Sequence, residues 1–314
     1  MSAATKPLGF SIALFPYDRW GGLQPIAQAA RLAEDLGFAG IQFPEHIIMP
    51  VRPDVPSVSV VWYDNFVLAA YLAALTKRVR LIFSVMVAPY RPPVQMAKMA
   101  ATLDQVSGGR LVLGVGVGWL RGEFRTLGIP FNERGAITDE YLKAMKVLWT
   151  AERPSFSGKY TSFANIAFEP KCVQQPHVPI WVGGRGPGPL RRVVELGDGW
   201  NPMTGTPEEL ATEIAWVKEQ AAQAGRDPSA LDFSYTLPVG EPDEAQDMST
   251  AHVTGGAHQA PKRASSPEEA IEAIGRHRDA GFNHLALRIG WKKPADFMRQ
   301  MEWFAAKVMP AFKR

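Results

Sequence analysis

The chain has 314 residues and a net charge of +3 at pH 7, with 46% hydrophobic and 21% charged residues. This composition is that of a globular protein and argues against a disordered chain. The 34 Lys and Arg side chains are scattered along the sequence rather than clustered, so we do not expect a nucleic-acid partner.

The single cysteine, Cys172, excludes an intramolecular disulfide framework and a metal site built from several cysteines. We expect its thiol to be buried or half-buried. The first residues, Met1 to Pro7, lack the apolar segment of a signal peptide. The longest apolar stretch, near Leu81 to Pro89, is far shorter than the ~20 residues that span a bilayer. The sequence therefore predicts a soluble, cytoplasmic protein with no membrane partner.

Short apolar runs alternate with longer amphipathic segments along almost the whole chain. The first amphipathic segment, Leu23 to Leu36, repeats its apolar side chains at helical spacing. Two later helices begin with a hydroxyl, a proline and a glutamate three residues on, at Thr206 and at Ser266. The predicted strands are Gly9–Phe15, Ala39–Phe43, Val79–Val85, Leu111–Val115, Ile180–Val182, Gly199–Pro202, Asp232–Leu237 and Asn283–Ile289.

Eight strand–helix units in this length give about 39 residues per unit, which is typical of a (β/α)8 TIM barrel. An open, doubly wound sheet is the alternative. Glycines at 37, 197 and 281 are expected to end helices in the left-handed conformation. Two connections are long: an insertion at 150–179 between strands four and five, and a polar loop at 240–265 after strand seven. No linker divides the chain, so residues 1–314 are predicted to form a single domain.

A dipeptide of an acid and a histidine, Glu45-His46, directly follows the second strand. Active sites of such barrels lie at the carboxyl ends of the strands, and histidine suits general acid–base catalysis near neutral pH. A plain surface loop is the alternative. The other five histidines have no such setting, and His177 and His277 are expected to face solvent.

Glycines follow the fourth strand at Gly114, Gly116 and Gly118. A dinucleotide fingerprint read from Gly116 needs a third glycine where Arg121 stands, so nicotinamide binding is weakly supported. The glycines either relieve crowding between strand and loop or let a flat ring or phosphate approach the backbone.

The fifth strand ends in Gly183-Gly184-Arg185, ahead of a helix that begins near Pro187. Backbone N–H groups at a helix start, together with a guanidinium, favour phosphate binding. A tight turn without a ligand is the alternative.

Three common enzyme motifs are absent from the sequence: the H-E-x-x-H zinc motif, the G-x-S-x-G elbow of hydrolases and the P-loop. A metal site is therefore not expected. Several aromatic residues, among them Trp62, Tyr63, Trp119, Trp200 and Trp291, can line an apolar pocket, although core packing explains most of them.

The sequence resembles the bacterial luciferase-like oxidoreductases from roughly Gly9 to Gly240. The resemblance is carried by segments distributed along the chain: GGRLVLGVGVGW at 108–119, EF at 123–124, LG at 127–128, FNERG at 131–135, TDEYL at 138–142, PHVPIWVGG at 176–184, LRR at 190–192 and LGDGW at 196–200.

This resemblance implies a TIM barrel that binds a flavin or the deazaflavin coenzyme F420 without covalent attachment, and the F420-dependent subgroup is the most similar. It implies that Glu45 and His46 lie against the reactive part of the ring, with Glu45 orienting His46 or contacting the ring. It also implies a non-prolyl cis peptide at Ser84-Val85, pressed against the middle of the ring. Homodimers are implied too.

The remaining cofactor contacts implied by the resemblance come from strands four and five. Gly116 and Gly118 are expected near the cofactor tail, and we add Trp119 to the cofactor-binding residues. The phosphate is expected at Val182, Gly183 and Gly184, with Arg185 beside it.

The chain departs from the deazaflavin alcohol and sugar-phosphate dehydrogenases at two positions. Pro50 stands where they have a tryptophan, and Trp119 stands where they have a glutamate. Glu123 lies nearby and can supply a carboxylate. We expect hydride transfer between F420 and a small or medium organic substrate. The alternative is an FMN-dependent monooxygenase that uses O2 and reduced flavin from a separate reductase. A barrel that binds a ligand without catalysis is a third possibility.

Overall fold

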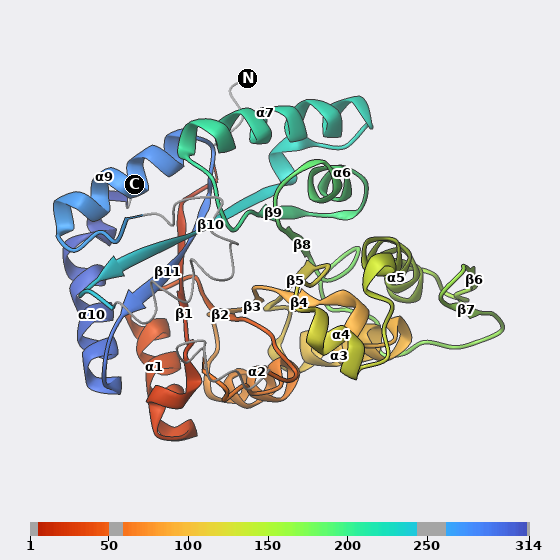
Figure 1. The fold of residues 1–314 in the computed structure, drawn as a ribbon, viewed down its shortest axis with the longest axis horizontal. Coiled ribbons are helices and arrows are strands. Elements are labelled where there is room, and N and C mark those ends of the chain that lie inside the picture. Colours follow the sequence, from red (N-terminus) through yellow and green to blue (C-terminus); the bar gives the residue numbers. More distant parts are fainter. Residues whose placement is uncertain (1–5, 50–58, 244–261, 313–314) are drawn as a thin grey trace.

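A computed structural model describes residues 6–49, 59–243 and 262–312 and shows a closed parallel barrel surrounded by helices (Figure 1). Its strands are β1 (Gly9–Ala13), β2 (Gly40–Phe43), β3 (Arg80–Phe83), β5 (Leu111–Gly116), β8 (Ile180–Gly183), β9 (Gly199–Asn201), β10 (Asp232–Gly240) and β11 (His284–Gly290).

The barrel closes through two pairings that an open sheet does not have. β1 pairs with β11, the last strand, and β3 pairs with β5 through Leu81 opposite Leu111. A two-residue strand, β4 (Met86–Val87), follows β3 and extends the pairing to β5. The (β/α)8 barrel is thus confirmed, and the open doubly wound sheet is excluded.

Helices cover the outside of the barrel (Figure 1). They are α1 (Leu23–Leu36), α2 (Asn65–Leu75), α3 (Pro93–Ser107), α5 (Arg134–Thr150), α6 (Pro187–Leu196), α7 (Pro207–Gln223), α9 (Pro267–Asp279) and α10 (Pro294–Lys307), with a short helix α4 (Arg121–Thr126) after β5. The predicted start of α7 is confirmed, because Thr206 and Glu209 form a reciprocal capping box. At the start of α9, the Ser266 side chain accepts a hydrogen bond from the Glu269 N–H.

Two of the three predicted helix-ending glycines adopt the left-handed conformation, Gly37 with φ of 84° and Gly281 with φ of 107°. The prediction for Gly197 is wrong, since its φ is −92°. A Cβ there would lie 2.9 Å from Val182 Cγ2 and 3.1 Å from Val193 Cα. Glycine is required at 197 because helix and strand approach closely.

The insertion between strands four and five holds a short antiparallel hairpin, β6 (Phe156–Ser157) and β7 (Ser162–Phe163), which projects away from the barrel (Figure 1). Its turn is tied to α5, because the N–H groups of residues 159–161 donate to the Glu140 carboxylate. Most of the predicted loop at 240–265 lies outside the described residues.

Three titratable side chains test the expected burial. Cys172 is buried as predicted, and burial raises the pKa of its thiol to about 11. The expectation that His177 and His277 face solvent is wrong, because both are buried and burial lowers the pKa of each. Each ring finds a backbone carbonyl instead of water: Val178 O at 2.9 Å and Ala273 O at 2.8 Å. Among the described helices, none is long and apolar enough to cross a membrane.

Candidate active site

The carboxyl ends of parallel barrel strands meet on one face of the molecule, and this face carries active sites in TIM barrels. The segments after β2, β3 and β5 bring His46, Ser84-Val85 and Glu123 to this face, with Asn201 at the end of β9.

His46 is held by the carboxylate of Glu123, which lies in α4. The His46 Nδ1 is 2.8 Å from Glu123 Oε2, which also accepts a 2.8 Å hydrogen bond from the Tyr90 hydroxyl. The other oxygen, Oε1, accepts from the N–H groups of Ile47 at 2.7 Å and Ile48 at 3.1 Å. One buried carboxylate therefore fixes both the imidazole and the backbone that follows it.

Glu123 is suited to stay ionised although its side chain is inaccessible to solvent. Burial works to raise the pKa of Glu123, but hydrogen bonds from His46 and Tyr90, the His46 charge and backbone N–H groups hold it below its usual value. An ionised carboxylate only accepts hydrogen bonds, so it assigns the proton of Nδ1 to His46. The Nε2 atom is then the one that can exchange a proton with a bound molecule.

Of the two roles expected for Glu45, orienting His46 is not what the structure shows, and contact with the ring stays a prediction. Its buried carboxylate accepts from the Val87 N–H at 2.6 Å and from Arg91 Nη1 at 2.5 Å, and Arg91 also contacts Asp64 at 2.7 Å. Burial raises the pKa of Glu45, and the Arg91 charge offsets only part of this. Adjacent residues of an extended segment project to opposite sides, so Glu45 anchors the chain after β3 while His46 faces Glu123.

The predicted non-prolyl cis peptide is present between Ser84 and Val85. The Ser84 side chain is held from β9, which does not pair with β3, since Asn201 Nδ2 donates to Ser84 Oγ at 2.9 Å. A Cβ on Gly116 or on Gly183 would lie 2.8 Å from a methyl group of Val85. Both glycines thus make room for the Val85 side chain.

The glycines at the end of the fourth barrel strand and in the turn after it relieve crowding, as the first interpretation expects, and the close approach of a ring or phosphate stays a prediction. A Cβ on Gly114 would lie 1.8 Å from the Phe83 carbonyl oxygen. Gly118 has a φ of 79°, and its Cβ would lie 2.6 Å from Val87 Cγ1 and 2.7 Å from Phe124 Cε2. The turn at Gly118 leads directly into the helix that carries Glu123.

Two tryptophans flank the His46 imidazole. The ring centroids lie 4.7 Å apart for Trp62 and 5.8 Å apart for Trp119, both edge-on to His46. Trp62 also stacks on Phe15 at 4.5 Å, whereas Trp119 is 48% exposed. The imidazole therefore lies between two aromatic side chains, of which Trp119 is accessible to solvent.

Arg185 turns away from the expected phosphate site. Its Nη1 lies 2.9 Å from Glu209 Oε2 and its Nε lies 3.0 Å from Glu213 Oε1, both on α7. These carboxylates compensate its charge, so we leave Arg185 out of the phosphate site. Gly183 and Gly184 remain in the segment before α6, where Gly184 has a φ of 100°.

Sequence reasoning gave no role to two residues of this site. Tyr90 carries no motif, and only the fold shows that its hydroxyl contacts Glu123. Burial and the Glu123 carboxylate raise the pKa of Tyr90, which keeps it a hydrogen-bond donor. Asn201 stands at the end of the sixth barrel strand, and this position was the only signal available for it.

This chain is similar to several known proteins. The family model for luciferase-like monooxygenase matches residues 12–304. An uncharacterized protein of Mycobacterium tuberculosis (strain ATCC 25618 / H37Rv) is 35% identical over 232 residues, which cover 69% of this chain and 80% of that protein. The FMNH(2)-dependent dimethylsulfone monooxygenase of Pseudomonas putida is 28% identical over 199 residues, which cover 62% of this chain and 53% of that protein.

A solved structure shows the same fold over the whole length. The structure of an F420-dependent secondary alcohol dehydrogenase in complex with an F420-acetone adduct has a TM-score of 0.81 and 23% identity, covering 99% of this chain and 100% of that chain. The fold, the strand-end site and the family model agree on an oxidoreductase of the flavin and deazaflavin type. The chain belongs to the luciferase-like monooxygenase family.

Proposed function

We propose that the protein is an F420-dependent oxidoreductase that moves a hydride between the deazaflavin and a small or medium organic substrate. The observation that carries this proposal is the His46 imidazole, fixed by the buried carboxylate of Glu123 on the strand-end face that also carries the cis peptide Ser84-Val85. The similarity to F420-dependent enzymes supports the choice of deazaflavin.

The residues at the strand ends fit a flat tricyclic ring that carries a phosphate. The Val85 side chain packs against the backbone at Gly116 and Gly183. It offers an apolar surface on which a ring can rest. Trp119 supplies an exposed aromatic face. We assign the phosphate to the backbone of Val182, Gly183 and Gly184. Glycine lets a phosphate approach the backbone closely, and the N–H groups at the start of α6 favour an anion.

The bound deazaflavin supplies the hydride chemistry, and the protein supplies orientation and proton transfer. When a substrate carbon gains or loses the hydride, His46 Nε2 would donate or accept the accompanying proton at the neighbouring substrate atom. Glu123 keeps the imidazole in one tautomer and one orientation. Trp62 and Trp119 exclude water from the imidazole.

An FMN-dependent monooxygenase is the second candidate, and it would receive reduced flavin from a separate reductase. The similarity to the dimethylsulfone monooxygenase supports it. So does Trp119, because a tryptophan replaces the glutamate that the resemblance to deazaflavin alcohol dehydrogenases leads one to expect there.

Three further expectations stay proposals. A homodimer is supported by α2, which has no charged residue and leaves Val67 70% exposed. A single domain over residues 1–314 is supported by the family match over 12–304. A cytoplasmic location remains a prediction from the sequence.

A parallel titration of the purified protein with F420 and FMN, followed by cofactor fluorescence, tests the proposed function. We expect tight binding of F420 and weak binding of FMN. Preference for FMN, together with oxygen consumption in the presence of reduced flavin, would overturn the F420 assignment in favour of the monooxygenase.

A further inference from the structure

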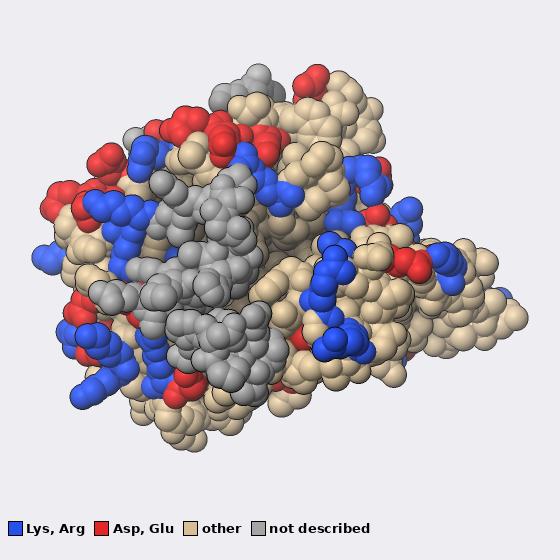
Figure 2. All heavy atoms as spheres, viewed as in Figure 1, with Lys and Arg blue, Asp and Glu red and all other residues tan. Residues whose placement is uncertain are grey.

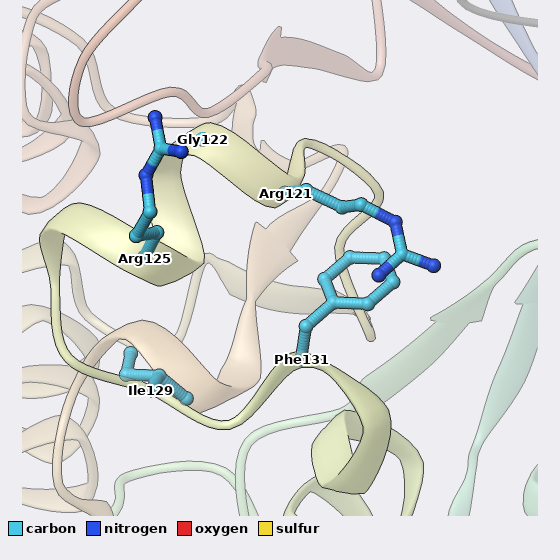
Figure 3. A pocket seen from close by; sticks show the side chains of 5 residues that line it. All are labelled: Arg121, Gly122, Arg125, Ile129 and Phe131. Atoms are coloured by element: carbon cyan, nitrogen blue, oxygen red, sulfur yellow. The ribbon is translucent and has the colours of Figure 1, made fainter.

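The short helix α4 has two faces with different chemistry. Its inner face buries Glu123, which holds His46, and Phe124. Its outer face presents Arg121 and Arg125, and both side chains are exposed. A pocket of about 370 Å³ lies on this outer face, lined by Arg121, Gly122, Arg125, Ile129 and Phe131 (Figure 3).

Among the described residues, no carboxylate pairs with the two arginines of this pocket. Within residues 6–49, 59–243 and 262–312, neither Arg121 nor Arg125 forms an ion pair. Like charges at i and i+4 on a helix are mutually destabilising, and isolated helices this short are marginal in water. The repulsion between Arg121 and Arg125 therefore destabilises α4, and a bound anion would reduce this repulsion.

Phe131 organises the guanidinium groups around it. The Cζ atoms of Arg121 and Arg134 lie 4.1 Å and 3.9 Å from the centre of the Phe131 ring. Arg134 is fixed further, because it donates to the Gly118 carbonyl at 3.2 Å and the Phe131 carbonyl at 2.9 Å. Lys and Arg atoms gather over α4 on the face shown in Figure 2. The pocket thus combines the Phe131 ring with the exposed guanidinium groups of Arg121 and Arg125.

We propose that the Arg121–Arg125 pocket binds the carboxylates of the acidic tail of F420, an inference that rests on the proposed function. A guanidinium matches a carboxylate with two parallel hydrogen bonds, and two guanidiniums suit a ligand with several carboxylates. The tail of F420 carries glutamate carboxylates beyond its phosphate, whereas FMN ends at a single phosphate.

The position of the pocket fits this role. Gly118 and Trp119, proposed as cofactor-binding residues, precede Arg121 by three and two positions in the chain. β5 pairs in parallel with β8, with Val115 opposite Val182, so the proposed phosphate segment at Val182–Gly184 lies beside the end of β5. A tail that continues from the phosphate past the turn at Gly118 reaches α4. Binding there also supports the helix that carries Glu123, so the tail stabilises the orientation of His46.

Fluorescence titrations with F420 and with its fragment that lacks the phosphate and tail test this proposal. We expect R121Q/R125Q to weaken F420 binding about 10-fold or more, more strongly at low salt, and to leave fragment binding unchanged. The control R31Q/R153Q removes two other exposed arginines, on α1 and in the insertion, and should bind F420 as the wild type does.

The outcomes separate this inference from the proposed function. If the wild type binds F420 tightly and R121Q/R125Q binds it equally well, the tail site is wrong and the function stands. If the wild type binds FMN but not F420, both fail. Competition by a short glutamate peptide, but not by inorganic phosphate at the same concentration, identifies the carboxylates rather than the phosphate as the bound groups. The reverse pattern would contradict the proposal.

Discussion

At the scale of single residues, the function depends on which carboxylate faces His46. Glu45 is the neighbour in sequence, but it binds Arg91 and the Val87 N–H. Glu123 is 77 residues away and forms the hydrogen bond. Both acids are buried. Burial raises the pKa of Glu45 because it outweighs the Arg91 charge and the Val87 N–H, whereas the pKa of Glu123 is lowered because hydrogen bonds from His46, Tyr90 and backbone N–H groups outweigh its burial.

Replacing His46 or its partner should separate catalysis from binding. We expect His46→Ala to lower turnover by about 100-fold or more, since general acid–base catalysis contributes factors of this size. Glu123→Gln should lower kcat with little change in cofactor affinity. Glu45→Gln, the same substitution at the adjacent acid, should lower stability more than kcat. Steady-state kinetics and cofactor titrations measure these effects.

The pH profile gives a further readout for Glu123. Its pKa is lowered in the folded protein, so its ionised form and the orientation of His46 are kept above the ordinary carboxyl pKa. Both are lost as the pH falls through the lowered value. Glu123→Gln should remove this acid limb. Unchanged turnover in His46→Ala would remove His46 from the mechanism altogether.

At the scale of elements, α4 depends on the turn that precedes it. Gly118 has a left-handed φ of 79°, and a Cβ there would overlap Val87 and Phe124. Gly122, four residues on, lies in the helix with nothing within 4 Å of its would-be Cβ. Gly118 therefore offers a test substitution, and Gly122 offers its control in the same segment.

We expect Gly118→Ala to destabilise the protein by more than ~1 kcal/mol, because left-handed backbone alone costs about that much for alanine. The displaced α4 should also lower turnover by moving Glu123. Gly122→Ala should be neutral or stabilise by about 0.5–1 kcal/mol. Urea unfolding and kinetics on both variants check this. Equal stability of the two variants would show that the turn does not constrain α4.

At the scale of the whole molecule, the exposed apolar residues of two neighbouring helices support the proposed homodimer. The outer surfaces of α2 and α3, which pack against one another, expose Val67 at 70%, Val106 at 58% and Val94 at 37%. Exposed apolar residues gathered on neighbouring helices mark a protein interface.

Val67→Asp should shift the proposed dimer to monomer, because a buried unpaired charge strongly disfavours an interface. The control Trp216→Asp introduces the same charge at an exposed residue of α7, which lies at the opposite side of the barrel from α2 (Figure 1). Light scattering gives the mass of each variant. A monomeric wild type, or a Val67→Asp protein that stays dimeric, would contradict the proposal.

The order of strands and helices could be read from the sequence, because hydrophobic periodicity and capping residues act locally. The eight barrel strands and the full extent of α1 follow from such signals. The position of His46 at a strand end also follows, since a parallel barrel gathers these ends on one face.

Contacts between distant segments were decided only by the tertiary structure. Barrel closure brings α4 against the segment after β2, and this gives His46 the Glu123 carboxylate rather than that of Glu45. The same packing ties Arg185 to α7 and leaves Arg121 and Arg125 without a carboxylate among the described residues. Local patterns place a side chain on an element, but its hydrogen-bond and charge partners depend on how the elements pack.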